Sequence, residues 1–167
     1  TQKFYGRNYR SDNDNDLFIS QNGKRNEATQ IFKEGDVFTN GLHNRGIAQA
    51  TQIGDDNVAK QTQEGAGNFQ KLYQNGDDNE AYMTAVGNYN MADVKQTGTS
   101  GYAKVVQKSS AGNVTDIADA KGNDVMLSQS GYNSEAHILQ EGLSNEVQGL
   151  GGDGTYALNN NKKKIKV

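Results

Sequence analysis

Polar and apolar residues follow a pattern that repeats every eleven residues from Gln52 to Val147. In the consensus frame a Gln is followed by a Gly two positions later, an Asn five positions later and an Ala seven positions later. Of the 36 slots in these nine frames, 25 hold the consensus residue, where a background usage of about 5–8% per residue type would give about two or three. Such a repeat determines the architecture of a chain.

Residues between the Asn slot and the next Gln slot alternate in character. Asn57, Ala59, Gln61 and Gln63 fall on one face, and the residues between them fall on the other. This period of two predicts a strand with one buried face. A helix is excluded because it needs apolar residues three and four apart, and one Gly per frame would destabilise it by about 1 kcal/mol each. The third inward position of successive frames is mostly apolar: Gln61, Leu72, Met83, Val94, Val105, Asp116, Leu127 and Ile138.

The Gln and Asn slots share the inward parity, so we expect their side chains to stack inside the fold. The inward ladder is predicted to contain Gln52, Asn57, Gln63, Asn68, Gln74, Asn79, Asn90, Gln96, Gln107, Asn123, Gln129, Gln140 and Asn145. Among the departures from the consensus, Ala85 and Ala118 occupy Gln slots and Gln70 occupies a small apolar slot. Buried amides without partners would cost about 1–3 kcal/mol each, and stacking identical amides in hydrogen-bonded ladders avoids that cost.

Each predicted strand ends in Gly-x-x-Asn, and Gly and Asn both tolerate the positive φ of tight turns. The predicted turn glycines are Gly54, Gly65, Gly76, Gly87, Gly98, Gly131 and Gly142. A circuit of strand, turn, strand and turn contains 22 residues, and the recurrence of Gly-Asp-Asp-Asn at 54–57 and 76–79 supports this length. We therefore predict an all-β fold, a β-solenoid whose circuits stack in parallel and in register about 4.8 Å apart.

The frame extends upstream with a change of phase. The motif from Gln21 to Ala28 matches the repeat, but Gln21 precedes Gln52 by two positions fewer than three full frames. We therefore expect a solenoid over 17–158 with a phase slip near 30–48, and a last short strand over 156–158. Residues 1–16 are predicted to form a disordered polar leader, and residues 159–167 a solvated basic tail.

Composition changes this predicted fold little but excludes several kinds of site and partner. Hydrophobic residues are 33% of the chain, a content that alone would indicate disorder, and the periodicity overrides that indication. Pro is absent, which fits a chain that is sheet nearly throughout because Pro cannot donate to a ladder. Cys is also absent, so disulfides and zinc–thiolate sites are excluded. The net charge of −3 argues against a nucleic-acid partner, and no stretch is long and apolar enough to span a bilayer.

Chemistry-bearing residues are few. His43 and His137 are the two histidines, and no catalytic motif accompanies them, so we expect no enzyme activity, no catalytic residue, no metal site and no cofactor. Four turn acids, Asp55, Asp56, Asp77 and Asp78, fall one circuit apart in pairs. Like charges about 5 Å apart repel, so we expect raised pKa values and a role as gatekeepers that restrain assembly. The alternative is a bound cation at this corner.

The pattern Gln-x-Gly-x-x-Asn-x-Ala-x-x-x-Gln, as in Gln52–Gln63, resembles the curlin repeat of bacterial curli subunits. The likeness covers about residues 17–147. It implies a structural subunit that is secreted through a dedicated outer-membrane channel and polymerises outside the cell as functional amyloid in biofilm matrix. It also implies three partners: further copies of the chain, a nucleator subunit and the secretion channel, for which residues 1–16 would be the export leader.

Two alternatives stay open beside the major fibre subunit. A basic tail also occurs in curli nucleators, so a minor nucleator is one of them, although the intact Gln and Asn slots favour the major subunit. A monomeric adhesin with capped solenoid ends is the other, and caps would distinguish it.

Overall fold

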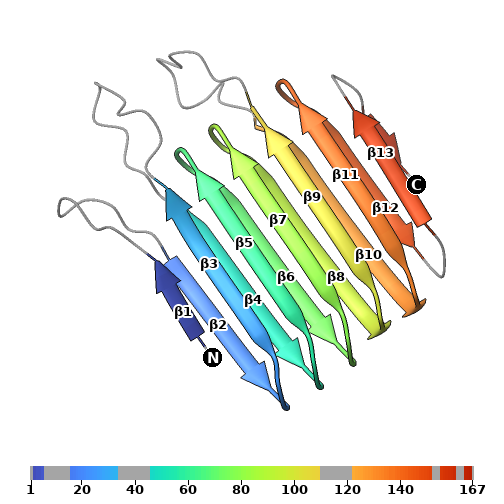
Figure 1. Ribbon diagram of the computed structural model, residues 1–167. Helices are drawn as coiled ribbons and strands as arrows, with labels where there is room; N and C mark the ends of the chain where they lie inside the picture. Colours follow the sequence, from blue (N-terminus) through green and yellow to red (C-terminus); the bar gives the residue numbers. More distant parts are fainter. Residues whose placement is uncertain are drawn as a thin grey trace.

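The structure is a computed structural model that describes residues 2–5, 16–33, 46–109, 122–151, 155–160 and 164–166. All of its regular elements are strands (Figure 1). Their bounds are β1 Gln2–Tyr5, β2 Asp16–Asn22, β3 Glu27–Lys33, β4 Ile47–Ile53, β5 Val58–Glu64, β6 Phe69–Asn75, β7 Glu80–Val86, β8 Met91–Thr99, β9 Tyr102–Lys108, β10 Asp124–Tyr132, β11 Glu135–Glu141, β12 Glu146–Gly151, β13 Thr155–Asn160 and β14 Lys164–Lys166.

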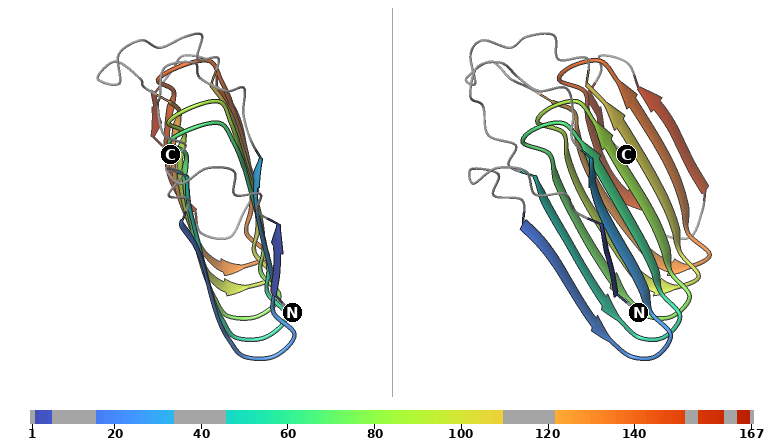
Figure 2. Two further views of the ribbon diagram at one scale, coloured as in Figure 1. Left: turned by 90° about the vertical axis from the view of Figure 1, so that its left-hand side faces the viewer. Right: turned by 60° about the vertical axis from the view of Figure 1, so that its left-hand side comes forward.

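Consecutive strands alternate between two sheets that face each other (Figure 2). The odd sheet has the order β1-β3-β5-β7-β9-β11-β13, and the even sheet has the order β14-β12-β10-β8-β6-β4-β2. Every pair of neighbouring strands is parallel. The chain therefore winds as a β-solenoid, and the predicted fold class is confirmed.

Stacked strands keep the consensus slots in register. From β4 to β7 each strand pairs with the strand that starts two frames later, as Ala59 pairs with Ala81 and Gln52 with Gln74. Between β2 and β4 the offset is longer, and Gln21 pairs with Gln52, as the upstream spacing predicts. The additional residues of this circuit lie between β3 and β4, where residues 34–45 are outside the described part of the chain.

One predicted frame is absent from the stack. Strand β8 pairs directly with β10, so that Gln96 matches Gln129, three frames later instead of two. The prediction of an unbroken repeat is therefore wrong at this point, where one frame contributes no strand between β8 and β10. That frame carries Ala118 in its Gln slot and Asp116 at an inward position. Burying an unpaired carboxylate is costly; residues 110–121 themselves lie outside the described chain.

The sheets extend at both ends beyond the range that the repeat predicts. Strand β1 pairs with β3 and strand β14 pairs with β12, in the segments for which the sequence predicts a disordered leader and a solvated tail. Strand β13 includes positions 156–158, where a last short strand is expected. An open edge of a parallel sheet pairs with any segment that offers N–H and C=O groups, which explains these short additions. An export role for residues 1–16 stays a prediction.

The core between the sheets is thin and unusually polar. Among the described residues, 20 buried side chains are polar and 18 are apolar. The apolar ones are the small residues of the Ala slot together with a central column that includes Leu72, Met83, Val94 and Val105. Because polar groups without partners destabilise a fold, the hydrogen bonding of the buried amides decides whether this core is stable.

Candidate functional site: stacked amide ladders

The structure places all thirteen predicted ladder residues inside the solenoid, each at most 1% exposed. The Gln slots of the even sheet form a continuous ladder, the even-sheet ladder. Nε2 of Gln21 donates to Oε1 of Gln52 at 2.7 Å, and Gln52 donates in the same way to Gln74 at 2.9 Å. Gln74 donates to Gln96 at 2.9 Å and Gln96 to Gln129 at 3.1 Å. Each amide thus donates to the next circuit toward the C-terminus.

The second N–H of these amides crosses the core to the backbone of the odd sheet. Nε2 of Gln52 donates to the carbonyl of Glu27 at 3.1 Å, and Nε2 of Gln74 donates to the carbonyls of Val58 and Asn79, both at 3.0 Å. One amide therefore connects two circuits and both sheets. These bonds satisfy the buried N–H donors, which would carry a large free-energy cost if they were buried without a hydrogen-bond partner.

The Asn slots form ladders of the opposite direction. Nδ2 of Asn57 donates back to Oδ1 of Asn26 at 3.2 Å, and Asn79 donates back to Asn57 at 3.1 Å. Asn145 donates to Asn123 at 2.8 Å in the same sense. Each Asn therefore donates toward the N-terminus, so the Gln and Asn ladders have antiparallel hydrogen-bond directions. A circuit consequently presents different groups on its two sides.

The turns beside the Asn slots differ from the expectation in one respect. All seven predicted turn glycines have positive φ, between 94° and 131°. The second positive φ of each turn falls on the residue before the Asn, such as Asp56 at 58° and Asp78 at 57°. The Asn itself is needed as a ladder member, because its Oδ1 also accepts the backbone N–H of the following Asn, as between Asn57 and Asn79 at 3.1 Å.

The glycines are required by close stacking as well as by φ. A Cβ added at Gly76 would lie 1.9 Å from the carbonyl oxygen of Gly98 in the next circuit. Such an approach to a backbone atom cannot be relieved by a side-chain rotation, so the turns can stack about 4.8 Å apart only without side chains at this slot.

The Gln slots of the odd sheet form an interrupted series, the odd-sheet ladder. Its stacked positions are Phe32, Gln63, Ala85, Gln107 and Gln140. Among the side chains that the structure describes, only Gln107 donates along it to the next circuit, to Gln140 at 3.0 Å. Among the buried side-chain atoms of the described residues, four carbonyl oxygens have no partner: Oε1 of Gln30, Gln63, Gln70 and Gln107. For three of these, the matching position in the preceding circuit holds no amide, since Phe32 precedes Gln63, Ala85 precedes Gln107 and Ala48 precedes Gln70.

Sequence reasoning missed several buried polar residues as ladder members. Gln30 donates to Gln61 at 2.7 Å in the central column, and inward parity was the signal for this pair. Asn88 and Ser109 form a second set in the turns, where the backbone N–H of Asn88 donates to Oγ of Ser109 at 2.8 Å. Ser109 occupies a Gly slot, and no pattern within one frame predicts its role.

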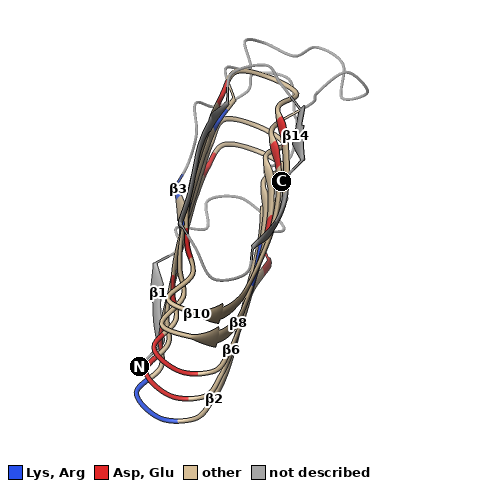
Figure 3. Cartoon of the chain, turned by 90° about the vertical axis from the view of Figure 1, so that its right-hand side faces the viewer, with Lys and Arg blue, Asp and Glu red and all other residues tan. Residues whose placement is uncertain are grey.

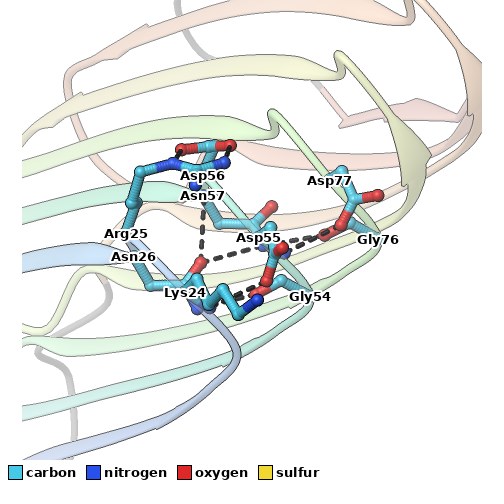
Figure 4. Close-up of polar contacts among 9 residues, drawn as sticks. All are labelled: Lys24, Arg25, Asn26, Gly54, Asp55, Asp56, Asn57, Gly76 and Asp77. Carbon is cyan, nitrogen blue, oxygen red and sulfur yellow. Dashed lines mark hydrogen bonds and ion pairs between the residues drawn. The ribbon is translucent and has the colours of Figure 1, made fainter.

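The predicted acidic corner contains a basic turn beside the acidic ones (Figure 3). Oδ1 of Asp55 accepts the backbone N–H of Lys24 at 2.7 Å, and Oδ1 of Asp77 accepts that of Asp55 at 2.8 Å (Figure 4). Arg25 forms an ion pair with Asp56. The carboxylates therefore continue the hydrogen-bond stack on the outside of the turns.

The expected rise in pKa is wrong at Asp56. The hydrogen bond from Arg25 lowers the pKa of Asp56 below its ordinary value of 3.8 and outweighs the opposing effect of burial. The physical reason is that the preceding circuit presents Arg25 where the following circuit presents Asp78. A gatekeeper role for the four acids stays a prediction. Within the described ranges, no group of three or more His, Cys, Asp or Glu residues is arranged to hold a metal ion.

None of the described elements is a helix long and apolar enough to cross a membrane. Searches of the curated proteins and of the solved structures gave no match.

A model of the curlin associated repeat matches residues 71–98. The matched segment includes Gln74, Asn79, Asn90 and Gln96, and thus both kinds of ladder, and the same slots recur in the circuits on either side. Residues 71–98 are therefore similar to the curlin associated repeat.

Proposed function

We propose that this protein is the major structural subunit of an extracellular curli-type fibre and that it polymerises head to tail. The carrying observation is the open stack of parallel strands. Among the described strands, β2 has a neighbour on one side only, and so does β13. The unpaired N–H and C=O groups of such edges template another strand. A contact between two different ends does not close, so it produces a filament.

The ladder directions support this assembly. Because Gln amides donate toward the C-terminus and Asn amides donate toward the N-terminus, the two ends of a stack offer different donors and acceptors. Ends that differ favour head-to-tail addition over the pairing of two like ends. Secretion through an outer-membrane channel and priming by a nucleator subunit are proposed from the curlin family.

The test is polymerisation of the purified chain after dilution from denaturant to tens of micromolar. We expect thioflavin fluorescence to rise after a lag, preformed fragments to remove the lag, and fibre diffraction to show spacings of about 4.8 Å and about 10 Å. A folded monomer that persists for days in analytical ultracentrifugation would contradict the proposal and would favour a capped adhesin.

A further inference from the structure

The outward faces of the two sheets differ in exposed apolar surface. Six large apolar side chains are exposed among the described residues, and five of them lie in strands of the even sheet: Phe18, Ile53, Met91, Met126 and Tyr132. The sixth, Leu143, lies in a turn. Phe18 is 56% exposed and Met126 is 49% exposed. Contiguous exposed apolar surface on a folded chain marks an interaction site.

Three apolar residues of the even face form a column, and further exposed apolar residues lie beside it. Ile47, Phe69 and Met91 occupy the same register position in β4, β6 and β8. The adjacent outward column contains Phe18 in β2 and Met126 in β10. Parallel in-register stacking therefore produces one apolar ridge, formed by Ile47, Phe69 and Met91, that runs along the solenoid axis.

Three charged side chains in the middle of the even face, Lys71, Asp93 and Lys95, have partners on that face, and Asp16, Asp124 and Glu146 lie at the starts of β2, β10 and β12. Between Phe18 and Met126 in the second column, Lys71 and Asp93 lie 4.0 Å apart as an ion pair. Lys95 lies over the ring of Tyr73, 5.8 Å from its centroid. Burial of the middle of this face would therefore leave Lys71, Asp93 and Lys95 with partners, and buried charges without partners are the main obstacle to a dry contact.

The odd face is more highly charged. The charged residues of its strands from β3 to β11, His137 aside, are Glu27, Lys33, Lys60, Glu64, Glu80, Lys104, Lys108, Glu135 and Glu141. None of the exposed large apolar side chains of the described chain lies in a strand of this sheet. Covering the odd face would cost desolvation of many charges, so the even face is the better docking surface.

We propose that the even face is a lateral interface that packs against the even face of a second copy, so that two filaments pair along their length. The inference rests on the proposed polymerisation. Two such faces share the strand spacing of about 4.8 Å, so their exposed apolar side chains can interdigitate as a dry zipper. Contact between two even faces also leaves the charges of both odd faces in solvent.

The area of the face determines when pairing occurs. Five strands of about seven residues cover roughly 23 Å by 24 Å, or about 1,100 Å² for two chains together, which is close to the lower limit of a stable interface. A pair of single chains is thus marginal. A filament repeats the contact once per chain, and multivalency then makes pairing strong. Pairing therefore follows polymerisation.

The experiment compares substitutions on the two faces of the same two circuits. The variant Met91→Lys/Met126→Lys adds charge to the even face, and Val106→Lys/Leu139→Lys adds it at outward positions of β9 and β11 on the odd face. Mass per length is measured by scanning transmission electron microscopy. We expect the even-face variant to have half the mass per length of the native fibre, and the odd-face variant to keep the native value.

A charge-complementary mixture distinguishes the loss of the lateral contact from misfolding of the variant. Filaments of Met91→Lys/Met126→Lys mixed with filaments of Met91→Glu/Met126→Glu should regain the native mass per length. The inference is overturned if native fibres consist of single filaments, if both faces respond alike, or if the mixture stays single. A native chain that forms no filament overturns the proposed function as well, whereas single native filaments overturn the lateral contact alone.

Discussion

The even-sheet ladder and the odd-sheet ladder use the same slot, the same parity and the same spacing, yet one is continuous and the other is interrupted. The even-sheet ladder has an amide in each of five successive circuits from Gln21 to Gln129. The odd-sheet ladder has Phe32 and Ala85 among its members, and carbonyl oxygens of Gln63 and Gln107 are left without partners. A ladder is thus a property of neighbouring circuits, and a conforming residue is satisfied only when the residue before it conforms.

The interrupted ladder survives because its donors are satisfied across the core. Nε2 of Gln63 donates to the carbonyl of Ile47 at 2.8 Å, and Nε2 of Gln107 donates to that of Met91 at 2.7 Å. The orphaned groups are acceptors only. A carbonyl oxygen without a partner costs about 1–3 kcal/mol of folding free energy, so each gap in the ladder is tolerated but lowers the stability of the stack.

The circuit of β6 and β7 shows a compensating exchange. Ile47, Phe69 and Met91 occupy the same register position in successive strands of the even sheet. Across the core, the side chain of Gln63 donates to the carbonyl of Ile47, and that of Gln107 donates to the carbonyl of Met91. Position 85 therefore faces 69–70 across the core. Ala85 occupies the Gln slot there, and Gln70 occupies the facing small slot. One amide and one methyl group are kept at this level, so the core volume is conserved.

The largest expected effect comes from breaking the continuous ladder. Gln74→Ala removes the donor to Gln96 and to two backbone carbonyls, and the acceptor of Gln52. Gln63→Ala removes a single donor, the one to Ile47. At about 1–3 kcal/mol for each orphaned group, we expect Gln74→Ala to destabilise the stack by at least about 1.4 kcal/mol more, a tenfold difference.

The readout for this pair is the concentration of chain left in solution when polymerisation reaches its plateau. Lys104→Ser, an outward substitution, serves as the control and should change that concentration little. Equal values for Gln74→Ala and Gln63→Ala would show that the two ladders contribute alike and that continuity does not matter.

A smaller effect should follow from repairing the interrupted ladder. Ala85→Gln combined with Gln70→Ala moves the amide back to the odd sheet, where it can accept from Gln63 and donate to the orphaned Oε1 of Gln107. We expect the double variant to gain about 1 kcal/mol and to leave less chain in solution. Ala85→Gln alone overfills the core against Gln70 and should cost about 1–3 kcal/mol. A single variant as stable as the double one would refute the facing assignment.

Strand positions, inward parity, turn glycines and the upstream offset could be read from the sequence, because a period of two and equal spacing determine facing and register directly. The omitted frame could not, since its slots are only slightly poorer than those of other frames. Asp116 was a signal there, because an acid at an inward position opposes burial. The orphaned acceptors and the partner of Asp56 depend on residues one circuit away, which only the register brings together.

The smallest expected effect lies outside the core, at the ion pair of Arg25 with Asp56. Both side chains are solvent-accessible, and salt screens such pairs, so losing it should matter much less than losing an amide of either ladder. Arg25→Gln should nevertheless raise the pKa of Asp56 from its lowered value toward 3.8. Because the folded pKa is depressed, the pair stabilises the fold above about 3.8, and this contribution is lost as pH falls through the folded pKa.

Carbon-13 shifts of the Asp56 carboxyl, followed by solid-state NMR on fibres equilibrated at different pH, measure the midpoint in the native chain and in Arg25→Gln. Lys24→Gln is the matched control, because Asp55 accepts the backbone N–H of Lys24 and not its side chain. We expect the midpoint to rise in Arg25→Gln alone. An unchanged midpoint in that variant would mean that the ion pair does not form in the fibre, and that the like-charge neighbour in the following circuit governs Asp56 as the sequence first predicts.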